Sequence, residues 1–313
     1  MGAAYEQRSD YANSFRHYEA GNALRRKSFN ADSMRITGLV DRAVETYGPE
    51  LFDRHKGIGH PAADPIFVVG LHRSGSTLIE QILSSHPLIE GTAELTVMQY
   101  IWERLGRIAS LHDRGPFQEL LELDSAAIRA IGEEYTERTR AFRMTDRPYY
   151  VDKLPANWMH LGLIRLALPK AKIIEARRHP MACGFSNFKQ NYAVGITFSY
   201  SLEAIGHFYS DYVRFMNHMD QVQPGAVHRV LNERLIDDLE GEVRRMLDFI
   251  GVPFDPACLE FHRNKRAIPT PSAEQVRRSI NRDGLDYWRR YESWLGPLKK
   301  ALGPALESWD KRP

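Results

Sequence analysis

A short apolar run followed by a glycine-rich loop constrains the fold of this 313-residue chain more than any other feature. Residues 66–70 read IFVVG, and such an uninterrupted apolar run is typical of a β-strand buried on both faces. A loop with glycines follows, and residues 77–85 then carry the apolar spacing of a helix. Strand, glycine-rich loop and helix in this order form phosphate-binding loops. We therefore expect an anion site where this helix begins.

Further strands and helices alternate along the rest of the chain. The β-type runs lie at 149–153, 172–176 and 226–231, and the helical patterns lie at 98–142, at 157–168, from Pro180 onward and at 238–250. This alternation predicts a central parallel sheet with right-handed crossovers. The expected fold is a three-layer α/β, P-loop-like domain over residues 61–313, with its binding site at the carboxyl ends of the strands.

Residues 1–60 have a different pattern, which is polar and helical. In residues 4–26, aromatic and alanine side chains recur at helical spacings on both sides of a turn at Ser9 and Asp10, and the segment resembles one tetratricopeptide hairpin. A single hairpin of this kind cannot bury its own faces. We therefore expect a repeat remnant packed on the main domain, the cut end of a longer repeat array, or a plain helical arm.

Composition limits the binding partners and the cellular compartment that we expect for this protein. Lys and Arg number 42 against 40 Asp and Glu, so the net charge of +2 gives no sign of binding to nucleic acid or to an acidic membrane. Cys183 and Cys258 lie far apart and match no metal-ligand spacing, which favours a reducing compartment. The N-terminus lacks the apolar core of a signal peptide, and no apolar run approaches the roughly 20 residues that cross a bilayer. We expect a soluble, cytoplasmic protein.

The loop after the first strand has phosphate-loop spacing with one departure. Gly70 is followed after four residues by Gly75, Ser76 and Thr77, but Ser76 stands where the nucleotide-triphosphate loop has its lysine. Backbone N–H groups at a helix N-terminus still bind a phosphate, with Arg73 as the cation and the hydroxyls of Ser74, Ser76 and Thr77 as donors. Because ATPases use the missing lysine together with Mg²⁺, the loop suits one 5′-phosphate with a transferable group better than a triphosphate. A P-loop kinase is the runner-up, and a nucleotide-binding protein with a repeat-type interaction arm is a third class.

The stretch PIFVVGLHRSGSTLIEQILSSHP, residues 65–87, resembles the 5′-phosphosulfate loop of the sulfotransferases that use 3′-phosphoadenosine-5′-phosphosulfate (PAPS). It is most similar to the tyrosylprotein sulfotransferase branch and to bacterial sulfotransferases with tetratricopeptide repeats, and the resemblance covers roughly residues 66–302. It implies transfer of a sulfonate group from PAPS to an acceptor hydroxyl, with release of 3′,5′-bisphosphoadenosine (PAP). The acceptor stays open between a peptide tyrosine, a sugar and a small phenol.

The resemblance also implies the catalytic residues. Glu94 matches the base of the tyrosylprotein branch, Lys153 matches the lysine that binds the bridging oxygen of the donor, and Ser272 matches a serine near the sulfonate. Together with Arg73, these residues are expected to carry the transfer. No metal is required, because the anions already have cationic partners. Beside them, Glu90 is the main rival as base, Asp152 is a potential partner of Lys153, and the place of His86 before a proline indicates a structural role.

A donor with a second phosphate needs a second anion site. Arg178 and Ser186 match the family's 3′-phosphate ligands, and Arg177, His179 and Lys189 add positive charge around them. The residues that match the loop covering the nucleotide are Gln275, Val276 and Arg278. This sequence departs from the branch at Gln190, where the branch has arginine, and at Tyr287, where it has lysine. Trp288, Tyr291, Trp294 and Leu295, at helical spacing, are expected in the core.

Overall fold

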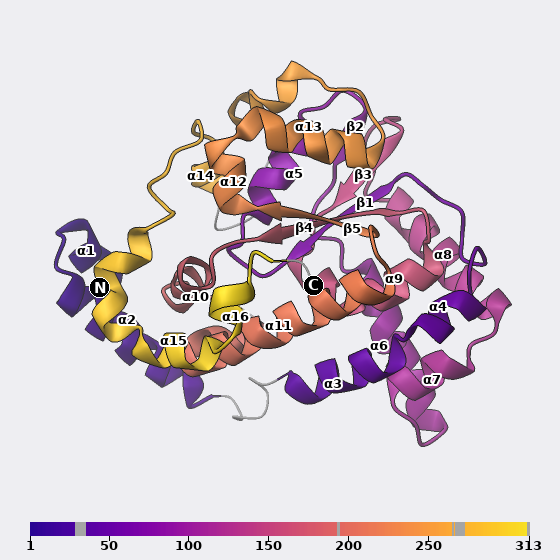
Figure 1. Cartoon of the computed structure of the whole chain (residues 1–313), viewed down its shortest axis with the longest axis horizontal. Helices are drawn as coiled ribbons and strands as arrows, with labels where there is room; N and C mark the ends of the chain where they lie inside the picture. The colour runs from indigo at the N-terminus through magenta and orange to yellow at the C-terminus, as the bar shows by residue number, and fades with distance from the viewer. Residues whose placement is uncertain (29–35, 193–194, 265, 267–272, 312–313) are drawn as a thin grey trace. The chain divides into compact units, whose positions relative to one another are not determined.

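The structure is a computed structural model that describes residues 1–28, 36–192, 195–264, 266 and 273–311 (Figure 1). The chain forms two compact units, one from residues 42–177 and 218–280 and the other from residues 1–41, 178–217 and 281–313. The first unit contains the sheet, and the second is helical. Among the residues described, no helix is both long and apolar enough to cross a membrane.

A parallel sheet of five strands organises the first unit, as far as its residues are described, in the order β2-β3-β1-β4-β5. The strands are β1 (Pro65–Gly70), β2 (Ile89–Gly91), β3 (Tyr149–Asp152), β4 (Lys172–Arg177) and β5 (Val227–Leu231). The four strands predicted from the sequence and the parallel α/β sheet are confirmed. Strand β2 was not predicted, because three residues are too few to show a period.

Strand β1 lies in the middle of the sheet, and every one of its residues is buried. Its side chains alternate between two apolar layers, as strand geometry requires. Ile66 and Val68 join the core that includes apolar residues of helices α5 (Ser76–Ser84) and α13 (Leu239–Ile250), drawn on one side of the sheet in Figure 1. Phe67 packs on the ring of Tyr135, 5.2 Å away between centroids. This burial on both faces is why the strand is apolar throughout.

Capping residues set the ends of the other helices in this unit. The helical pattern predicted over 98–142 is divided into α6 (Val97–Leu111), α7 (Pro116–Glu122) and α8 (Ser125–Arg140). Pro116 stands in the first turn of α7, and the Asp124 carboxylate accepts the Ala127 N–H at 2.8 Å to begin α8. The remaining helices of this unit are α4 (Pro49–Arg54), the 3₁₀ turn η2 (Pro155–His160), α9 (Leu161–Ala167), α12 (Asn232–Asp237), η4 (Pro256–Cys258), η5 (Phe261–Arg263) and α14 (Ala273–Val276).

The second unit is built from helices on three separate parts of the chain. They are α1 (Gly2–Gln7), α2 (Tyr11–Arg26), α10 (Pro180–Phe188), η3 (Thr197–Tyr200), η6 (Tyr287–Trp294), α15 (Gly296–Leu302) and α16 (Ala305–Ser308). Helices α3 (Thr37–Thr46) and α11 (Leu202–Val222) each run across a boundary between the two units in the chain, and α11 was not predicted. Trp288, Tyr291 and Leu295 are buried, as expected for core residues, whereas Trp294 is half-buried.

The predicted turn between the first two helices is confirmed. Ser9 has a left-handed φ of 60°, and the carboxylate of Asp10 accepts the Asn13 N–H at 3.1 Å, which caps α2. The Tyr18 hydroxyl of α2 donates to Glu6 of α1 at 2.6 Å. The identity of this hairpin as a tetratricopeptide remnant and the domain boundary between residues 60 and 61 stay predictions.

Candidate active site

The loop between β1 and α5 turns through backbone conformations that glycine favours. Gly70 and Gly75 have φ values of 145° and 103°. A Cβ at Gly70 would overlap the carbonyl oxygen of Ala176 on the neighbouring strand, so only glycine fits there. The Ser74 hydroxyl donates to the Leu71 carbonyl oxygen at 2.7 Å and closes the turn. Ser74 therefore holds the shape of the loop with its side chain.

Helix α5 begins at the end of this loop, with its positive end at the carboxyl edge of the sheet. Gly75 is the N-cap and has no side chain with which to cap the first-turn N–H groups. Ser76 and Thr77 follow in the first turn, and both are buried. A helix N-terminus that carries hydroxyls and follows a glycine-rich turn has the chemistry that binds a phosphate. The structure thus builds the predicted loop in the predicted place.

Glu94 and Lys153 come together because the chain after β2 continues along β3. The Thr92 N–H donates to the Val151 carbonyl oxygen at 3.3 Å, and the Lys153 N–H donates to the Ala93 carbonyl oxygen at 3.3 Å. This extended pairing places Glu94 beside the end of β3. The Lys153 Nζ then lies 2.6 Å from the Glu94 Oε1. Two residues predicted to act in one reaction are therefore in direct contact.

The two side chains differ in exposure. The Lys153 side chain is 2% exposed, whereas the Glu94 side chain is 41% exposed. A buried ammonium group requires anionic partners, because desolvation disfavours its charge. A second carboxylate meets this need: the Glu80 Oε2 lies 3.6 Å from the Lys153 Nζ, and Glu80 also pairs with Arg266. The result is a row of alternating charges, Arg266, Glu80, Lys153 and Glu94.

Sequence reasoning missed Glu80, although a signal was present. Glu80 lies four residues after Ser76 and three after Thr77, the spacings that place side chains on one face of a helix. A carboxylate on the same face as the phosphate-loop hydroxyls is unexpected at an anion site unless cations pair with it. His72 was also missed: burial lowers its pKa to about 4, Glu94 opposes this shift and Lys153 adds to it. The imidazole is neutral at neutral pH.

The expected pair between Asp152 and Lys153 is wrong. Asp152 accepts a hydrogen bond from the Tyr135 hydroxyl at 2.8 Å and another from the Asn157 amide at 3.4 Å. Consecutive residues of a strand point to opposite faces of the sheet, so Asp152 turns away from its neighbour. Burial raises the pKa of this carboxyl group to about 7.

The rival bases have structural partners. Glu90 accepts the backbone N–H groups of Met144 and Thr145 at 2.5 and 3.1 Å. His86 is buried, its Nδ1 accepts the Leu88 N–H at 3.1 Å, and its Nε2 lies 2.9 Å from the Pro253 carbonyl oxygen. Because Nδ1 accepts, Nε2 carries the proton. These contacts fit the structural role predicted for His86 and extend it to Glu90.

Arg178 and Ser186 belong to the helical unit. Arg178 follows β4 in the chain, its guanidinium donates to the Gly284 carbonyl oxygen, and its own carbonyl oxygen accepts the Tyr209 hydroxyl at 2.7 Å. Ser186 lies half-buried on α10. The Lys189 Nζ lies 2.5 Å from Glu6 and 4.7 Å from the centroid of the Tyr287 ring. Glu6 thus offsets part of the positive charge expected in this segment.

Two further cations predicted near Arg178 have other environments. The Arg177 guanidinium is buried and donates to Glu175 at 2.6 Å, and the other oxygen of Glu175 accepts from Arg229 at 2.7 Å. Arg177 is therefore part of a buried ion-pair network, and Glu175 offsets the positive charge that Arg177 was expected to add near Arg178. His179 stacks on Trp288, with 5.4 Å between ring centroids, and burial lowers its pKa.

The segment expected to cover the nucleotide is described in part. Ser272 lies outside the described residues. Gln275 belongs to the short helix α14, which contacts α5, while Val276 is buried and Arg278 is exposed. The chain before this segment is hydrogen-bonded to the end of α5, because the Asn264 amide donates to the Ser84 and Ser85 hydroxyls at 3.3 Å each.

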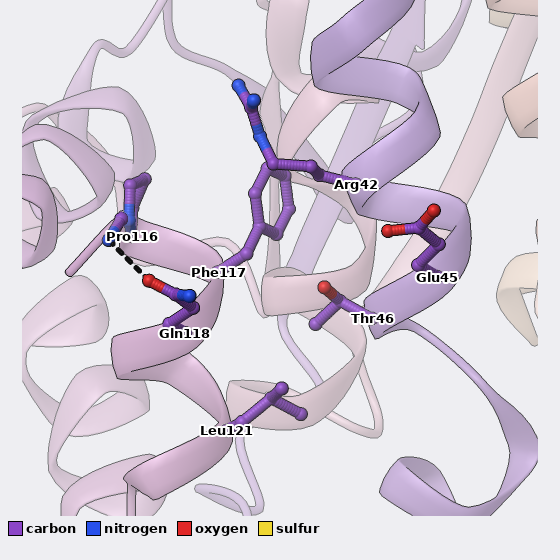
Figure 2. Close-up of a pocket in the computed structure, with 8 residues that line it drawn as sticks. Arg42, Glu45, Thr46, Pro116, Phe117, Gln118 and Leu121 are labelled. Atoms are coloured by element: carbon purple, nitrogen blue, oxygen red, sulfur yellow. Dashed lines mark hydrogen bonds between the residues drawn. The ribbon is translucent and has the colours of Figure 1, made fainter.

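A separate pocket of about 600 Å³ lies away from these residues, between the ends of α3 and α7 (Figure 2). Arg42, Glu45 and Thr46 line one side. The other side consists of Gly115, Pro116, Phe117, Gln118 and Leu121. The pocket includes none of the predicted site residues.

Comparison with known proteins gives relatives over most of the chain. A protein of Aquifex aeolicus (strain VF5), of uncharacterised function, is 32% identical over 321 residues, which cover 98% of this chain and 42% of that protein. A Caenorhabditis briggsae protein, named as a candidate protein-tyrosine sulfotransferase, is 26% identical over 234 residues, which cover 71% of this chain and 80% of that protein. This chain therefore spans less than half the length of the Aquifex relative.

Solved structures share the fold. The sulfotransferase domain of the Synechococcus PCC 7002 olefin synthase has a TM-score of 0.53 and 24% identity, covering 74% of this chain and 89% of that domain. The sulfotransferase domain of the curacin biosynthetic pathway has a TM-score of 0.54 and 19% identity, covering 82% of this chain and 100% of that domain. The profile of the Sulfotransferase family matches residues 65–256, which hold the strands of the sheet and the phosphate loop. With more than half of its 313 residues in that match, the chain belongs to the sulfotransferase family.

Proposed function

We propose that this protein transfers a sulfonate group from PAPS to an acceptor hydroxyl and releases PAP. The observation that carries the proposal is the contact between Lys153 and Glu94 at 2.6 Å, within the unit that also holds the phosphate loop. A buried cation and an exposed carboxylate in contact fit a reaction that needs both a leaving-group partner and a base.

The phosphate loop is suited to the 5′ end of the donor. Gly75 leaves the first turn of α5 without a side-chain cap, and Ser76 and Thr77 add hydroxyls there. Arg73 contributes the cation of the loop. We assign Arg178 and Ser186 to the 3′-phosphate. The residues assigned to the cover of the nucleotide are Ser272, Gln275, Val276 and Arg278.

The chemistry follows from the exposure of the two central side chains. Glu94 is exposed enough to meet an acceptor, so it takes the proton from the attacking hydroxyl. The acceptor oxygen forms a bond to sulfur while the bond from sulfur to the bridging oxygen breaks, and the electron pair stays on the 5′-phosphate. Lys153 and Arg73 stabilise the charge that grows on that phosphate, and Ser272 assists at the sulfonate.

The acceptor class is a hydroxyl compound, and a peptide tyrosine is our first candidate. Its support is the Caenorhabditis briggsae relative named for protein-tyrosine sulfotransfer. A sugar and a small phenol are the alternatives that an acceptor screen must include. Cys183 and Cys258 are both buried thiols, which supports a reducing compartment such as the cytoplasm.

Calorimetry with PAP, and separately with ATP in the presence and absence of Mg²⁺, tests the donor. A sulfotransferase site binds PAP more tightly than ATP, because it is built for phosphates at the 5′ and 3′ positions. Tighter binding of ATP that depends on Mg²⁺ would overturn the proposal in favour of a P-loop kinase.

Radiolabelled PAPS with peptide, sugar and phenol acceptors tests the reaction. The variant that tests the role of the cation is Lys153→Met, which keeps the length of the side chain and removes its charge. We expect PAP to bind this variant more weakly, because its 5′-phosphate loses a cationic partner, and turnover to fall by a larger factor of about 10²–10³. Wild-type protein that binds PAP but labels no acceptor in the screen would limit it to a binding function.

A further inference from the structure

Glu80 is a buried carboxylate that the proposed reaction does not use. Its side chain is 1% exposed, and it stands on α5, the helix that begins at the phosphate loop. One of its oxygens lies 3.6 Å from the Lys153 Nζ, and the other pairs with Arg266. The carboxylate therefore joins a proposed catalytic lysine to a residue of the segment that leads to α14.

A buried carboxylate in this position contributes little to the stability of the fold, which suggests that it has another role. Burial of a charged group is unfavourable, and a buried ion pair is often no more stable than well-packed apolar side chains. Anions are also unfavourable near the site of another anion, and Glu80 stands one helical turn from Ser76 and Thr77. Stability alone is thus a poor explanation for a glutamate here.

The reaction changes the charge of the other partner of Lys153. When Glu94 takes the proton from the acceptor, its carboxylate becomes neutral and its attraction for the ammonium disappears. The long side chain of lysine is flexible and loses its position easily without a partner. The Glu80 side chain is 1% exposed and also pairs with Arg266, so its contact with the ammonium does not depend on Glu94.

Arg266 fixes the second oxygen of Glu80. Its backbone N–H donates to the Asn264 side-chain oxygen at 3.1 Å, and its carbonyl oxygen accepts from Arg277 at 3.3 Å. A side chain at Gly91 would overlap the Arg266 guanidinium, which shows how closely β2 packs on it. The carboxylate of Glu80 is thus held at both ends, by its helix and by this arginine.

We propose that Glu80 is a positioning residue for sulfonate transfer: it holds the Lys153 ammonium at the leaving phosphate after Glu94 has been protonated. This inference rests on the proposed function. Glu80 acts through Lys153 and touches neither the acceptor nor the sulfur.

The first experiment needs no activity. Thermal unfolding of Glu80→Gln, Lys153→Met and the double variant forms a cycle that measures the coupling of the two side chains. We expect the loss of melting temperature to be non-additive, with a smaller effect of Glu80→Gln when Lys153 is already methionine. Additive losses would overturn the contact on which the inference depends.

The second experiment measures single turnover with radiolabelled PAPS and the acceptor identified in the screen. Glu80→Gln should lower the rate about 10- to 100-fold, while the dissociation constant of PAP changes by less than about threefold. In the Lys153→Met background, Glu80→Gln should change the rate by less than about twofold, because Glu80 acts through that lysine. The matched control is Glu242→Gln, which removes a buried carboxylate paired with Arg245 on α13 and should keep the wild-type rate.

The outcomes separate this inference from the proposed function. Wild-type protein that transfers no sulfonate refutes the proposed function. Wild-type transfer with an unchanged rate in Glu80→Gln refutes only the role of Glu80. A rate loss that persists in full in the Lys153→Met background, or that is matched by an equal loss of PAP affinity, also refutes it.

Discussion

The ammonium of Lys153 lies 2.6 Å from the carboxylate of Glu94, although 59 positions separate the two residues in the chain. Neither side chain could reach the other without the pairing of β2 beside β3. This contact joins a buried positive charge to an exposed negative one. It is the basis of the first prediction.

Glu94→Gln keeps the shape of the side chain and removes the base. We expect sulfonate transfer to slow by at least about 10²-fold, because loss of a general base typically costs that much. PAP should bind as it does to the wild type, since the proposed mechanism assigns Glu94 to the acceptor and not to the donor. Radiolabelled transfer and calorimetry measure the two quantities. Glu103→Gln, at an exposed position on α6, is the control, and near-normal turnover of Glu94→Gln would mean that the base lies elsewhere.

Arg178→Ala tests the second anion site. A charge-assisted hydrogen bond contributes about 1.5–3 kcal/mol. Since about 1.4 kcal/mol is tenfold in affinity, the dissociation constant of PAP should rise roughly tenfold or more. Calorimetry measures this change, with Arg263→Ala as a control in an exposed ion pair with Glu260. Unchanged affinity in Arg178→Ala would remove this residue from the donor site.

His86→Asn separates a structural histidine from a catalytic one. The ring bridges the Leu88 N–H and the Pro253 carbonyl oxygen, so its loss leaves buried groups with poorer partners. Such changes cost about 1–3 kcal/mol of stability. We expect a lower melting temperature and a transfer rate within about threefold of the wild type. A folded His86→Asn protein with a rate comparable to that of Glu94→Gln would instead make His86 a candidate base.

Asp152→Asn tests the raised pKa of the buried carboxyl group. Its pKa is about 7 in the folded protein and 3.8 in the reference state, so the folded state binds the proton more tightly. Its contribution to stability is complete below about pH 4 and is lost as the pH rises through 7. Asparagine does not titrate. The melting temperature of the variant, measured relative to that of the wild type at the same pH, should therefore rise between pH 5 and about pH 8.

Comparing Asp152→Asn with the wild type at each pH controls for the other buried groups that titrate. His72 and His160 have pKa values lowered to about 4 by burial, so their effect on stability has the opposite sign. Both are present in the two proteins, and their effect cancels in the difference. A difference in melting temperature that stays constant with pH would show that Asp152 does not titrate in this range.

The elements that sequence reasoning found are those with strong local patterns. Strand β1 is apolar throughout because it is buried on both faces, and α5 follows a loop whose glycines adopt positive φ. Strand β2 has three residues and no period to read. Helix α11 was overlooked although a start signal was present, because Ser201 precedes it and the Ser201 hydroxyl accepts the Ala204 N–H at 3.4 Å. The helical pattern over 98–142 reads as continuous, but it is divided into three helices, and Pro116 and Asp124 mark where the second and third begin.

The site shows the same division between local and long-range information. Spacing pointed to the phosphate loop, and family resemblance pointed to Glu94 and Lys153. Their contact depends on strand order, which no local pattern encodes. The pairing of Glu80 with Arg266 likewise joins residues 186 positions apart. Arg177 was expected to add positive charge near Arg178, but Glu175, two positions earlier on β4, pairs with it, and the other oxygen of Glu175 accepts from Arg229 of β5.

The left-handed backbone of Arg73 has a consequence for the evolution of this loop. Its φ is 67°, a conformation that costs a residue with a side chain about 1–2 kcal/mol and costs glycine almost nothing. Arg73→Gly should therefore raise the melting temperature while weakening PAP binding, which differential scanning calorimetry and titration would detect; a lower melting temperature would contradict this. Laboratory selection for heat resistance alone should then enrich the Arg73→Gly substitution and yield proteins that are more stable but bind PAP more weakly.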